Sequence, residues 1–377
     1  MAKRGKYERQ KPKKKGRKIL TIVLCTLLAI VLVAGIAGVV LYNNMLNKMN
    51  RVEVVEQEYT MTDEILAMMG TNPPTEATVA TTGAATEGTT VPETTSETVP
   101  KDPDILNVLV VGQSFREGET SRLADTMILV TINKDTKVVT LTSFLRDTYV
   151  DLPDYMGHTC GWNRINTNYA LGYVWGGAGG AMEMTNLCIK QNFGIEVDYN
   201  VEIDFTVFTK VIDILGGVRI ELTQAECDYI NGLGREWLQV VEPGENRLFG
   251  ETALEYARMR KADGDSDSDI KRTERQRKLM VALFNKVITK GVSAIRDIAN
   301  EILPMITHNM TNDQITECLF DVLPLLVDMK IETGTCPVQG YYWAEDKETP
   351  DGWASVLCFA RNEQMALMMP ITEGYAP

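Results

Sequence analysis

The chain has 377 residues, a formal net charge of −13 at pH 7 and only two histidines, His158 and His308. Its acidity argues against nucleic acid as a partner, because a nucleic-acid-binding surface is normally basic. No Ser-His or Cys-His constellation is evident in the sequence, so base-activated acyl chemistry has little support.

The N-terminal region joins a basic tail to a long uncharged segment. Residues 1–18 hold ten Lys or Arg and a single acid, and residues 19–42 hold no charged side chain. At about 1.5 Å per residue, a helix of this length would measure about 36 Å and would cross a hydrocarbon core of about 30 Å. We therefore predict a single transmembrane helix over 19–42.

This segment also sets the expected location of the chain. A cleaved signal peptide is the alternative, but its apolar core has only about 7–15 residues and ends at small residues. Residues 19–42 are longer and lack a clear Ala-x-Ala pattern. The basic tail is expected to stay cytoplasmic and to contact anionic lipid head groups. We expect a single-pass protein of the cell membrane with an extracellular body.

Two segments separate the predicted span from that body. Residues 43–70 are interpreted as a juxtamembrane segment. Residues 71–101 are rich in Thr, Pro and Glu and contain almost no large apolar residue, so they cannot bury enough surface to fold. We interpret 71–101 as a disordered extracellular linker that spaces the body from the bilayer.

The folded body starts at residue 102 and is long enough for one large domain with a substantial core. Residues 105–111, ILNVLVV, form an apolar run that ends at Gly112, which predicts a central buried strand. Strands and helices alternate after it, so the expected fold is an α/β protein, an α-β-α sandwich with a central mixed sheet. The main domain is assigned to 102–330, and 331–377 to a C-terminal extension of the same domain.

A β-hairpin is predicted next, because two strand-like runs, 127–132 and 137–144, flank the turn-forming residues 133–136. Asp125 precedes the first run and Arg146 follows the second, so antiparallel pairing would place them near one another. A carboxylate can hold a divalent cation, and a guanidinium can bind phosphate oxygens. A surface ion pair beside an ordinary hairpin is the other interpretation.

The segments after the hairpin are expected to be a loop, a glycine-rich entry into a helix, and scaffold elements over 197–222. The residues between Val150 and about residue 170 are interpreted as a loop. The glycine-rich segment 176–180 is interpreted as a flexible entry into a helix over 181–192. The glycines lack the Gly-Lys-Ser/Thr ending of a phosphate-binding loop. A strand is expected over 197–205 and a helix over 206–215.

Two arginines follow a plausible helix over 250–257. Arg258 and Arg260 are two positions apart. Such side chains diverge on a helix but share a face where the chain is extended. An extended segment after this helix would therefore allow the two guanidinium groups to point the same way.

A polar stripe is predicted on the next helix. Asp269, Arg272 and Gln276 are spaced at i, i+3 and i+7, which places them on one side of a helix that continues to about Val287. The alternative is a solvated helix start with an ordinary salt bridge.

Seven ordered motifs together resemble the LytR-CpsA-Psr family of membrane-anchored cell-wall proteins, from about residue 105 to 287. The motifs are ILNVLVVG, LADTMILV, LTSFLRDTYV, RINTNYALG, DILGGVRIEL, ALEYARMR and DIKRTERQ. The resemblance implies an Mg²⁺-dependent phosphotransferase that moves a glycopolymer, of teichoic acid or capsular polysaccharide type, from a polyprenyl-pyrophosphate carrier to peptidoglycan.

The resemblance also implies roles for individual residues. Asp125 would hold the metal, and Asp269 would position an arginine or accept the proton of the acceptor hydroxyl. Catalytic roles fall to Asp125, Arg146, Arg258, Arg260 and Asp269, and substrate-binding roles to Arg116, Arg122, Arg272 and Gln276.

Two departures from the family pattern concern the metal site. Where the family has Gly-x-Asp-x-Arg, this chain reads Gly-Gln-Ser-Phe-Arg over 112–116, so Ser114 replaces a carboxylate as the second metal ligand. The family's arginine two residues before the metal-binding Asp is here Leu123, and Arg122 lies one place earlier. A polyprenyl-pyrophosphate-binding regulatory or wall-binding protein with weak or no catalysis is therefore one alternative, and a polyprenyl pyrophosphatase is another.

Two further expectations concern apolar residues and cysteines. A polyprenyl tail would need an apolar slot between the sheet and the helices. Its candidate lining residues, for each of which plain core is the favoured interpretation, are Val207, Ile212, Leu215, Leu279, Leu283 and Phe284. Six cysteines follow the predicted span, and either a disulfide, with Cys336–Cys358 as the first candidate, or free thiols are compatible with the sequence.

Overall fold

The structure of the chain is a computed structural model that describes residues 46–47, 49–54, 101–113, 123–260, 262, 268–290, 301–318, 325 and 328–374. The chain divides into the units Met1–Lys48 and Met49–Pro377, and the second unit is the folded body. The predicted anchor 19–42 and all of the predicted linker except Lys101 lie outside the described residues. Among the helices that are described, none has the length and hydropathy of a membrane-spanning segment.

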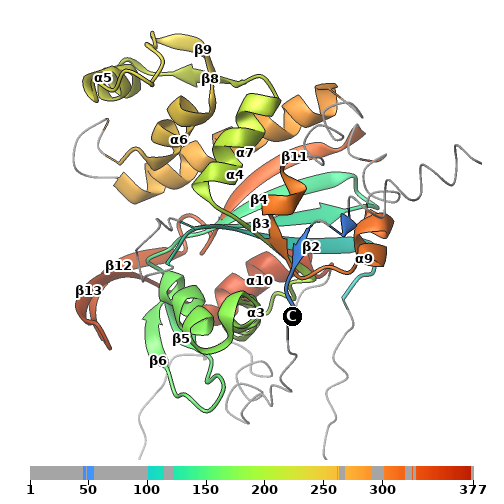
Figure 1. The fold of residues 1–377 in the computed structure, drawn as a ribbon. Coiled ribbons are helices and arrows are strands. Elements are labelled where there is room, and N and C mark those ends of the chain that lie inside the picture. The colour runs from blue at the N-terminus through green and yellow to red at the C-terminus, as the bar shows by residue number, and fades with distance from the viewer. Residues whose placement is uncertain are drawn as a thin grey trace, which may run out of the picture. The chain divides into compact units, whose positions relative to one another are not determined.

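A seven-stranded mixed sheet forms the centre of the described body (Figure 1). Strand β2 lies between β7, with which it pairs in parallel, and β3, with which it pairs antiparallel. This position confirms the predicted central strand and the mixed sheet. In spatial order the strands are β1 (Asn50–Arg51), β10 (Thr307–His308), β7 (Tyr199–Ile203), β2 (Ile105–Gln113), β3 (Ala124–Asn133), β4 (Val138–Phe144) and β11 (Lys330–Cys336).

The predicted hairpin is the β3–β4 pair. Met127 pairs with Phe144 near one end of its antiparallel ladder, and Asn133 pairs with Val138 at the other. The Asn133 side chain accepts a hydrogen bond of 2.8 Å from the Thr136 backbone N–H, which is the turn chemistry that the sequence indicates.

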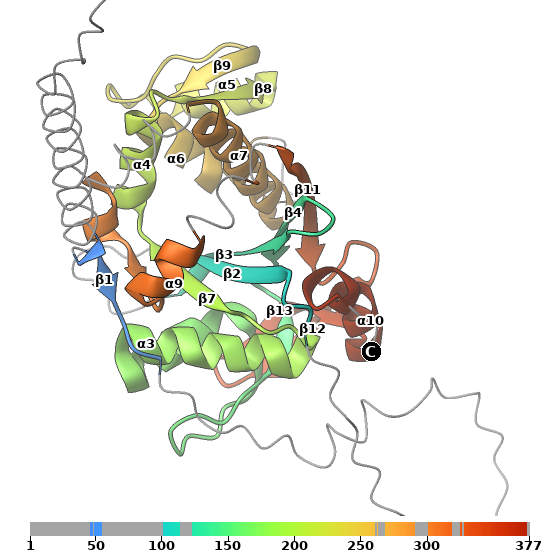
Figure 2. The same cartoon turned by 90° about the vertical axis from the view of Figure 1, so that its right-hand side faces the viewer.

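Helices cover both faces of the sheet, which confirms the α-β-α sandwich (Figure 2). Strand β2 alternates between the two faces: Leu109 and Val111 are buried in the core that includes α3, and Val110 and Gly112 face the other way. The helices on the first face are α3 (Ile165–Phe193) and α10 (Arg361–Thr372), and those on the second are α4 (Phe205–Ile214), α6 (Gly250–Arg258) and α7 (Ser268–Lys290).

The helices of the second face have a core of their own. It includes Tyr256 of α6 and Leu279 of α7, both almost fully buried. The small antiparallel pair of β8 (Val218–Leu222) and β9 (Gly244–Leu248) and the helix α5 (Gln224–Gly232) complete it. This core holds α6 and α7 in place independently of their contacts with the sheet.

Helix α3 begins earlier than the sequence indicates, at Ile165 instead of residue 181. The glycine-rich segment is a break inside the helix, where Gly176 and Gly177 leave helical geometry and Gly177 has φ 65°. The loop predicted up to residue 170 is therefore wrong. Its polar side chains are buried instead, and Asn168 donates a 3.2 Å hydrogen bond to Thr185 across the two halves of the helix.

The C-terminal extension belongs to the same body. Strand β11 pairs in parallel with β4 and closes one edge of the sheet. The pairs β5 (Tyr149–Leu152) with β6 (Gly161–Arg164) and β12 (Tyr342–Thr349) with β13 (Gly352–Phe359) form two hairpins outside the sheet. The short helix α9 (Asn312–Glu317) begins with a capping box at Thr311. Both Cys336 and Cys358 are free thiols, so the disulfide considered from the sequence is wrong.

Candidate functional site

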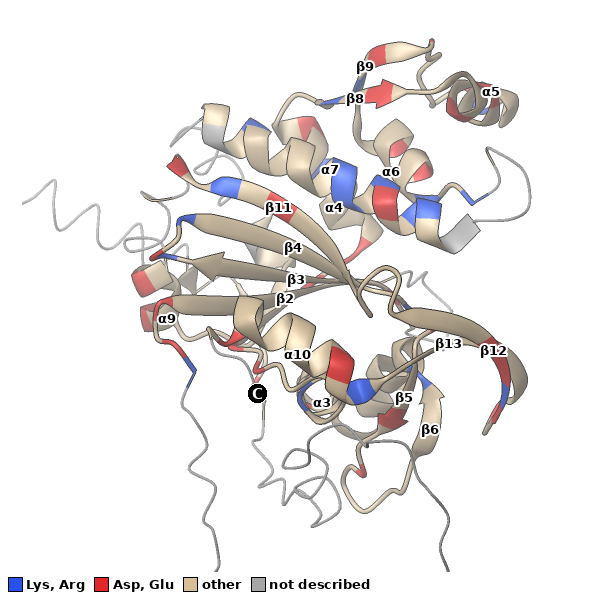
Figure 3. Cartoon of the chain, turned by 180° about the vertical axis from the view of Figure 1, so that it is seen from behind, with Lys and Arg blue, Asp and Glu red and all other residues tan. Residues whose placement is uncertain are grey.

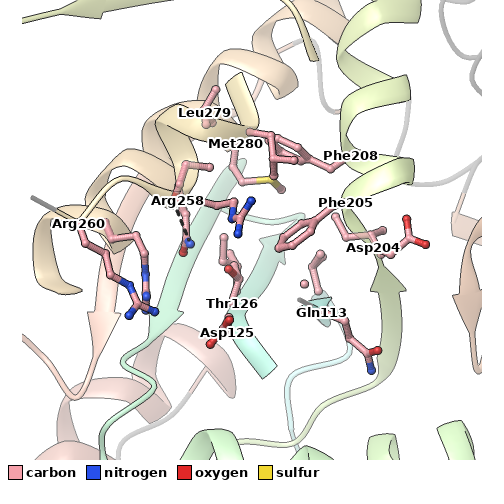
Figure 4. Close-up of a pocket in the computed structure, with 18 residues that line it drawn as sticks. Gln113, Asp125, Thr126, Asp204, Phe205, Phe208, Arg258, Arg260, Leu279 and Met280 are labelled. Atoms are coloured by element: carbon pink, nitrogen blue, oxygen red, sulfur yellow. Dashed lines mark hydrogen bonds between the residues drawn. The ribbon is translucent and has the colours of Figure 1, made fainter. Parts of the chain in front are cut away.

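A cavity of about 360 Å³ lies between the sheet and the helices α4, α6 and α7 (Figure 4). It has an apolar part and a polar part. The apolar and backbone lining comes from Val110, Gly112, Ile128, Ile203, Phe205, Phe208, Leu254, Ala257, Leu279 and Met280. The polar lining comes from Gln113, Asp125, Thr126, Asp204, Arg258, Arg260, Arg272 and Gln276.

Asp125 and Arg146 lie together, as the hairpin predicts. Asp125 is at the start of β3 and lines the cavity, and Arg146 follows the end of β4. Arg146 Nη1 lies 3.4 Å from Asp125 Oδ1, and Arg146 Nε lies 3.4 Å from Asp147 Oδ2. Arg164 adds a second cation to the cluster, with Nη1 3.7 Å from Asp147 Oδ1. Two guanidinium groups and two carboxylates therefore meet beside the cavity.

Arg258 and Arg260 both line the cavity, as the sequence predicts. Helix α6 ends at Arg258, and Met259 has extended geometry with φ −58° and ψ 128°. The Met259 side chain is fully buried in the helical core, so the residues on either side point the other way. The Arg258 guanidinium lies 5.0 Å from the Phe205 ring centroid and 3.7 Å from Glu255 Oε1.

The predicted stripe on α7 also faces the cavity. Arg272 is 4% exposed and Gln276 is half-buried, and both line the cavity together with Leu279. Gln276 Nε2 donates a hydrogen bond of 3.5 Å to the Ala257 carbonyl of α6. The Asp269 side chain lies outside the described residues, as do Ser114, Arg116 and Arg122, so their predicted roles stay predictions.

Arg275 of α7 binds the backbone of the segment that carries Arg258 and Arg260. Its Nε donates a 2.7 Å hydrogen bond to Glu226 Oε1, and its Nη1 donates a 3.2 Å hydrogen bond to the Met259 carbonyl. Both side chains of this ion pair are at least nine-tenths buried. The backbone between Arg258 and Arg260 is therefore fixed by a buried ion pair between α5 and α7.

Several lining residues were not identified from the sequence. Gln113 follows the predicted central strand, and Phe205 and Phe208 occupy the first turn of α4. The Asp204 side chain caps that helix by accepting a 2.7 Å hydrogen bond from the Val207 N–H, and this capping pattern was the available signal. The register of Thr126 beside Gly112 is set by the pairing of β3 with β2.

The cavity lies between sheet and helices, where the sequence analysis expects an apolar slot, and most of the candidate lining residues are ordinary core. Of the six candidates, Leu279 lines the cavity. Ile212, Leu215 and Leu283 belong to the core of the helices and Phe284 packs against the neighbouring cluster, and Val207 is 1% exposed. Helical periodicity identifies the buried side of a helix but does not separate residues that pack from residues that border a void.

The side chains that line the cavity offer too few ligands to hold a metal ion by themselves, so a metal would need further ligands from a bound phosphate. Among the described residues there is no group of three or more His, Cys, Asp or Glu side chains that could hold a metal. Asp125 presents one carboxylate to the cavity, beside the polar side chains of Gln113 and Thr126. Mg²⁺ sites commonly consist of one or two carboxylates, water and substrate phosphates. The residues present fit an Mg²⁺ ion that shares its coordination with a bound phosphate.

The cavity combines two kinds of surface. Figure 4 shows Asp125 and Arg260 in one part, Phe208, Leu279 and Met280 toward the helices, and Arg258 between them beside Phe205. Guanidinium groups bind phosphate oxygens through paired donors, and an apolar void gains free energy by enclosing hydrocarbon. This arrangement suits an amphiphile with a phosphate head and an apolar tail.

Known proteins resemble this chain in sequence and fold. The model of the LytR_cpsA_psr family matches residues 75–351. The polyisoprenyl-teichoic acid--peptidoglycan teichoic acid transferase TagU of Oceanobacillus iheyensis is 31% identical over 257 residues, which cover 66% of this chain and 74% of that protein. The corresponding transferase TagT of Bacillus subtilis is 30% identical over 231 residues, which cover 60% of this chain and 66% of the relative.

A solved structure shares the fold. It is the LytR-CPS2A-psr family protein YwtF (TagT) with bound octaprenyl pyrophosphate lipid, which matches with a TM-score of 0.51 and 22% identity over 72% of this chain and 92% of that chain. At this identity the likeness establishes the fold alone. The family model, by contrast, matches well over half of the sequence and contains every described residue that lines the cavity. The chain belongs to the LytR-CpsA-Psr family.

Proposed function

We propose that this chain is a membrane-anchored, Mg²⁺-dependent phosphotransferase of the outer face of the cell membrane. It moves a glycopolymer from a polyprenyl-pyrophosphate carrier to peptidoglycan. The observation that carries the proposal is the cavity, which joins an apolar interior to Arg258, Arg260, Arg272 and Asp125. The names of the relatives, which are teichoic acid transferases, support it.

The cavity can bind both parts of the carrier. The apolar lining between α4 and α7 would enclose part of the polyprenyl chain, and the arginines would bind the pyrophosphate oxygens. Arg258 is oriented for this by Glu255 and by the Phe205 ring, and the segment that carries Arg260 is held by Arg275. Positioning and charge stabilisation are what phosphoryl transfer requires of a protein.

The transfer step is a substitution at phosphorus. A hydroxyl oxygen of the acceptor forms a bond to the phosphorus that bears the glycan, and the bond from that phosphorus to the bridging oxygen breaks. Polyprenyl phosphate leaves, the hydroxyl proton goes to a carboxylate, and Asp269 is the candidate for that role. A bound Mg²⁺ would neutralise phosphate charge, and Asp125 is the residue that would hold it.

Arg146 is placed to respond to the developing negative charge. It is shared between Asp125 and Asp147 at 3.4 Å each, so a phosphate that enters beside Asp125 offers it a stronger, charge-assisted partner. Removing one such donor from a transition state typically lowers the rate by about 10²–10³-fold.

A transfer assay with the full-length chain in proteoliposomes tests the proposal. The substrates are a polyprenyl-pyrophosphate-linked glycan and peptidoglycan oligomers, with and without Mg²⁺. Arg146→Ala is the test variant, and Arg219→Ala, which removes an exposed ion pair between Arg219 of β8 and Glu245 of β9, is the control.

Glycan that appears on peptidoglycan with the wild type and Arg219→Ala, and not with Arg146→Ala, would support the transferase. Tight lipid binding without transfer at any Mg²⁺ concentration would contradict it and leave a binding protein. Release of polyprenyl phosphate and glycan phosphate without an acceptor would indicate a pyrophosphatase.

A further inference from the structure

The β12–β13 hairpin projects from the end of the central sheet (Figure 3). Its eight cross-strand pairs run without a register shift from Tyr342–Phe359 to Thr349–Gly352. Side chains alternate between its two faces. One face carries Val356 and Cys358, which are 1% and 8% exposed. The opposite face, here called the wing face, consists of Tyr342, Ala344, Asp346, Glu348, Trp353, Ser355, Leu357 and Phe359, the last of which packs against the core at the base of the hairpin.

The wing face is open along most of its length. Trp353 is 75% exposed, and Ala344, Asp346 and Ser355 are also exposed. Tryptophan, which joins a large apolar ring to a polar N–H group, is enriched at surfaces that bind a partner. The backbone at Trp353 is held by the pairing of β13 with β12 and by the burial of Val356 and Cys358 on the opposite face.

The base of the wing face is attached to the candidate active site. The Leu357 N–H donates a hydrogen bond of 2.9 Å to the Asp147 carbonyl, and Leu357 forms a parallel bridge with Thr148. Asp147 is the residue that pairs with both Arg146 and Arg164. The wing face therefore starts one residue from the Arg146 backbone.

The tip of the hairpin is also held. The Tyr149 hydroxyl of β5 donates a 3.3 Å hydrogen bond to the Glu348 carbonyl, and the Asn163 amide of β6 donates a 3.3 Å hydrogen bond to Asp351. From Leu357 to Trp353 the strand runs four residues, or about 14 Å at about 3.4 Å per residue. This distance corresponds to a short oligosaccharide, so Trp353 would meet a sugar beyond the reacting one.

The net negative charge of the hairpin indicates which kind of polymer could bind to it. Strands β12 and β13 and their turn carry Glu345, Asp346, Glu348 and Asp351 against the single cation Lys347. Such a surface repels a polyanionic phosphate polymer. It suits a neutral glycan, whose ring C–H groups can stack on an indole and whose hydroxyl groups can donate to carboxylates.

We propose that the wing face is the acceptor subsite, where a neutral glycan strand of peptidoglycan lies with one sugar ring on Trp353 and its reacting hydroxyl directed toward Arg146. This inference rests on the proposed transferase function. It assigns the two substrates to different surfaces: the lipid-linked donor to the cavity between sheet and helices, and the acceptor to the hairpin.

The first test measures binding without catalysis. The full-length chain in detergent is titrated with a chitooligosaccharide, a neutral oligomer of β-linked N-acetylglucosamine, and binding is followed by calorimetry. Trp353→Ala is expected to bind about tenfold more weakly, because it loses the stacked ring, and Trp353→Phe to recover most of the affinity. Trp343→Ala is the matched control, since Trp343 is 52% exposed on the opposite face of the same hairpin, and it is expected to bind like the wild type.

The second test uses the transfer assay with the same variants. Trp353→Ala is expected to raise the KM for the acceptor about tenfold, with unchanged kcat and unchanged KM for the donor. Equal oligosaccharide affinity in Trp353→Ala and Trp343→Ala would overturn the subsite, whether or not transfer occurs. If the chain binds the oligosaccharide through Trp353 but transfers no glycan, the glycan-binding site on the wing face would stand and the proposed transferase function would be rejected.

Discussion

Asp125 and Arg146 face each other across the open end of the β3–β4 pair, with Oδ1 and Nη1 3.4 Å apart. Both are partly exposed, with side-chain exposures of 31% and 20%, and Arg146 is also bound to Asp147. An ion pair of this kind contributes little to stability. In the function that we propose, it keeps a carboxylate and a guanidinium available to the phosphate groups of the donor.

Asp125→Asn is expected to lose the response to Mg²⁺, because the variant removes the described carboxylate that we assign to the metal. Transfer should fall about 10²-fold or more, and Mg²⁺ should no longer strengthen the binding of polyprenyl pyrophosphate. Mg²⁺ titrations of both quantities measure this. Asp104→Asn, which alters an exposed pair with Lys134, should respond like the wild type. An Asp125→Asn protein with normal Mg²⁺ dependence would place the metal elsewhere.

Ala257→Phe is expected to shorten the lipid that the cavity accepts. Ala257 lines the cavity from α6, so a larger side chain fills space that the prenyl tail would occupy. Each CH₂ group that is excluded costs about 0.8 kcal/mol of hydrophobic free energy, so two of them weaken binding about tenfold. Affinities for a long and a two-unit prenyl pyrophosphate are compared. Equal losses for both would argue against an apolar tail site.

Arg275→Met is expected to destabilise the body by about 3–5 kcal/mol, because it leaves the buried Glu226 carboxylate without its partner. Urea unfolding of the full-length chain in detergent measures the change. The control Lys278→Met removes an exposed pair with Glu274 on the same helix and should cost about 0.5 kcal/mol or less. Similar losses in the two variants would show that the buried pair has no special role.

The stability of the body should fall as the pH rises toward neutrality. Burial raises the pKa of Glu373 to about 7, and the residue is 1% exposed. The group therefore binds its proton more tightly in the folded state, and its contribution is present below about pH 4.5 and lost as the pH passes about 7. The expected loss is about 3 kcal/mol.

Glu373→Gln should flatten this profile and be the more stable protein at pH 8. The charged groups that face Glu373 are Lys101, Glu196 and Asp198, and the variant leaves them unchanged. Unfolding free energies at pH 5 and pH 8 provide the comparison. A wild type that is more stable at pH 8 than at pH 5 by the same margin as the variant would contradict the assignment.

Local patterns were sufficient for much of the site. The turn chemistry at 133–136 and the two flanking strand patterns placed Asp125 beside Arg146. The spacing of Arg258 and Arg260 around an apolar residue predicted their common direction, and the helical spacing of Arg272 and Gln276 predicted their common face. Each of these inferences depends on residues close together in the chain.

The remaining features depend on contacts between distant segments. The start of α3 is polar, and its helical state follows from burial against its own second half across the Gly176–Gly177 break. The cavity requires Phe205 and Leu279 to leave a space between them, which no single helix pattern specifies. The attachment of Leu357 to Asp147 joins residues 210 positions apart in the sequence.

Strand β2 contributes side chains to the hydrophobic core on one face of the sheet and to the cavity on the other. Leu109 and Val111 are almost fully buried in the core beside α3, while Val110 and Gly112 border the cavity on the other face. Inserting or deleting one residue within the strand would exchange the two sets of side chains, and neighbours on both sides prevent the strand from adjusting. Over these nine residues the length of the strand is constrained both by the core beside α3 and by the lining of the cavity. Insertions and deletions are therefore confined to the loops at the two ends of the strand.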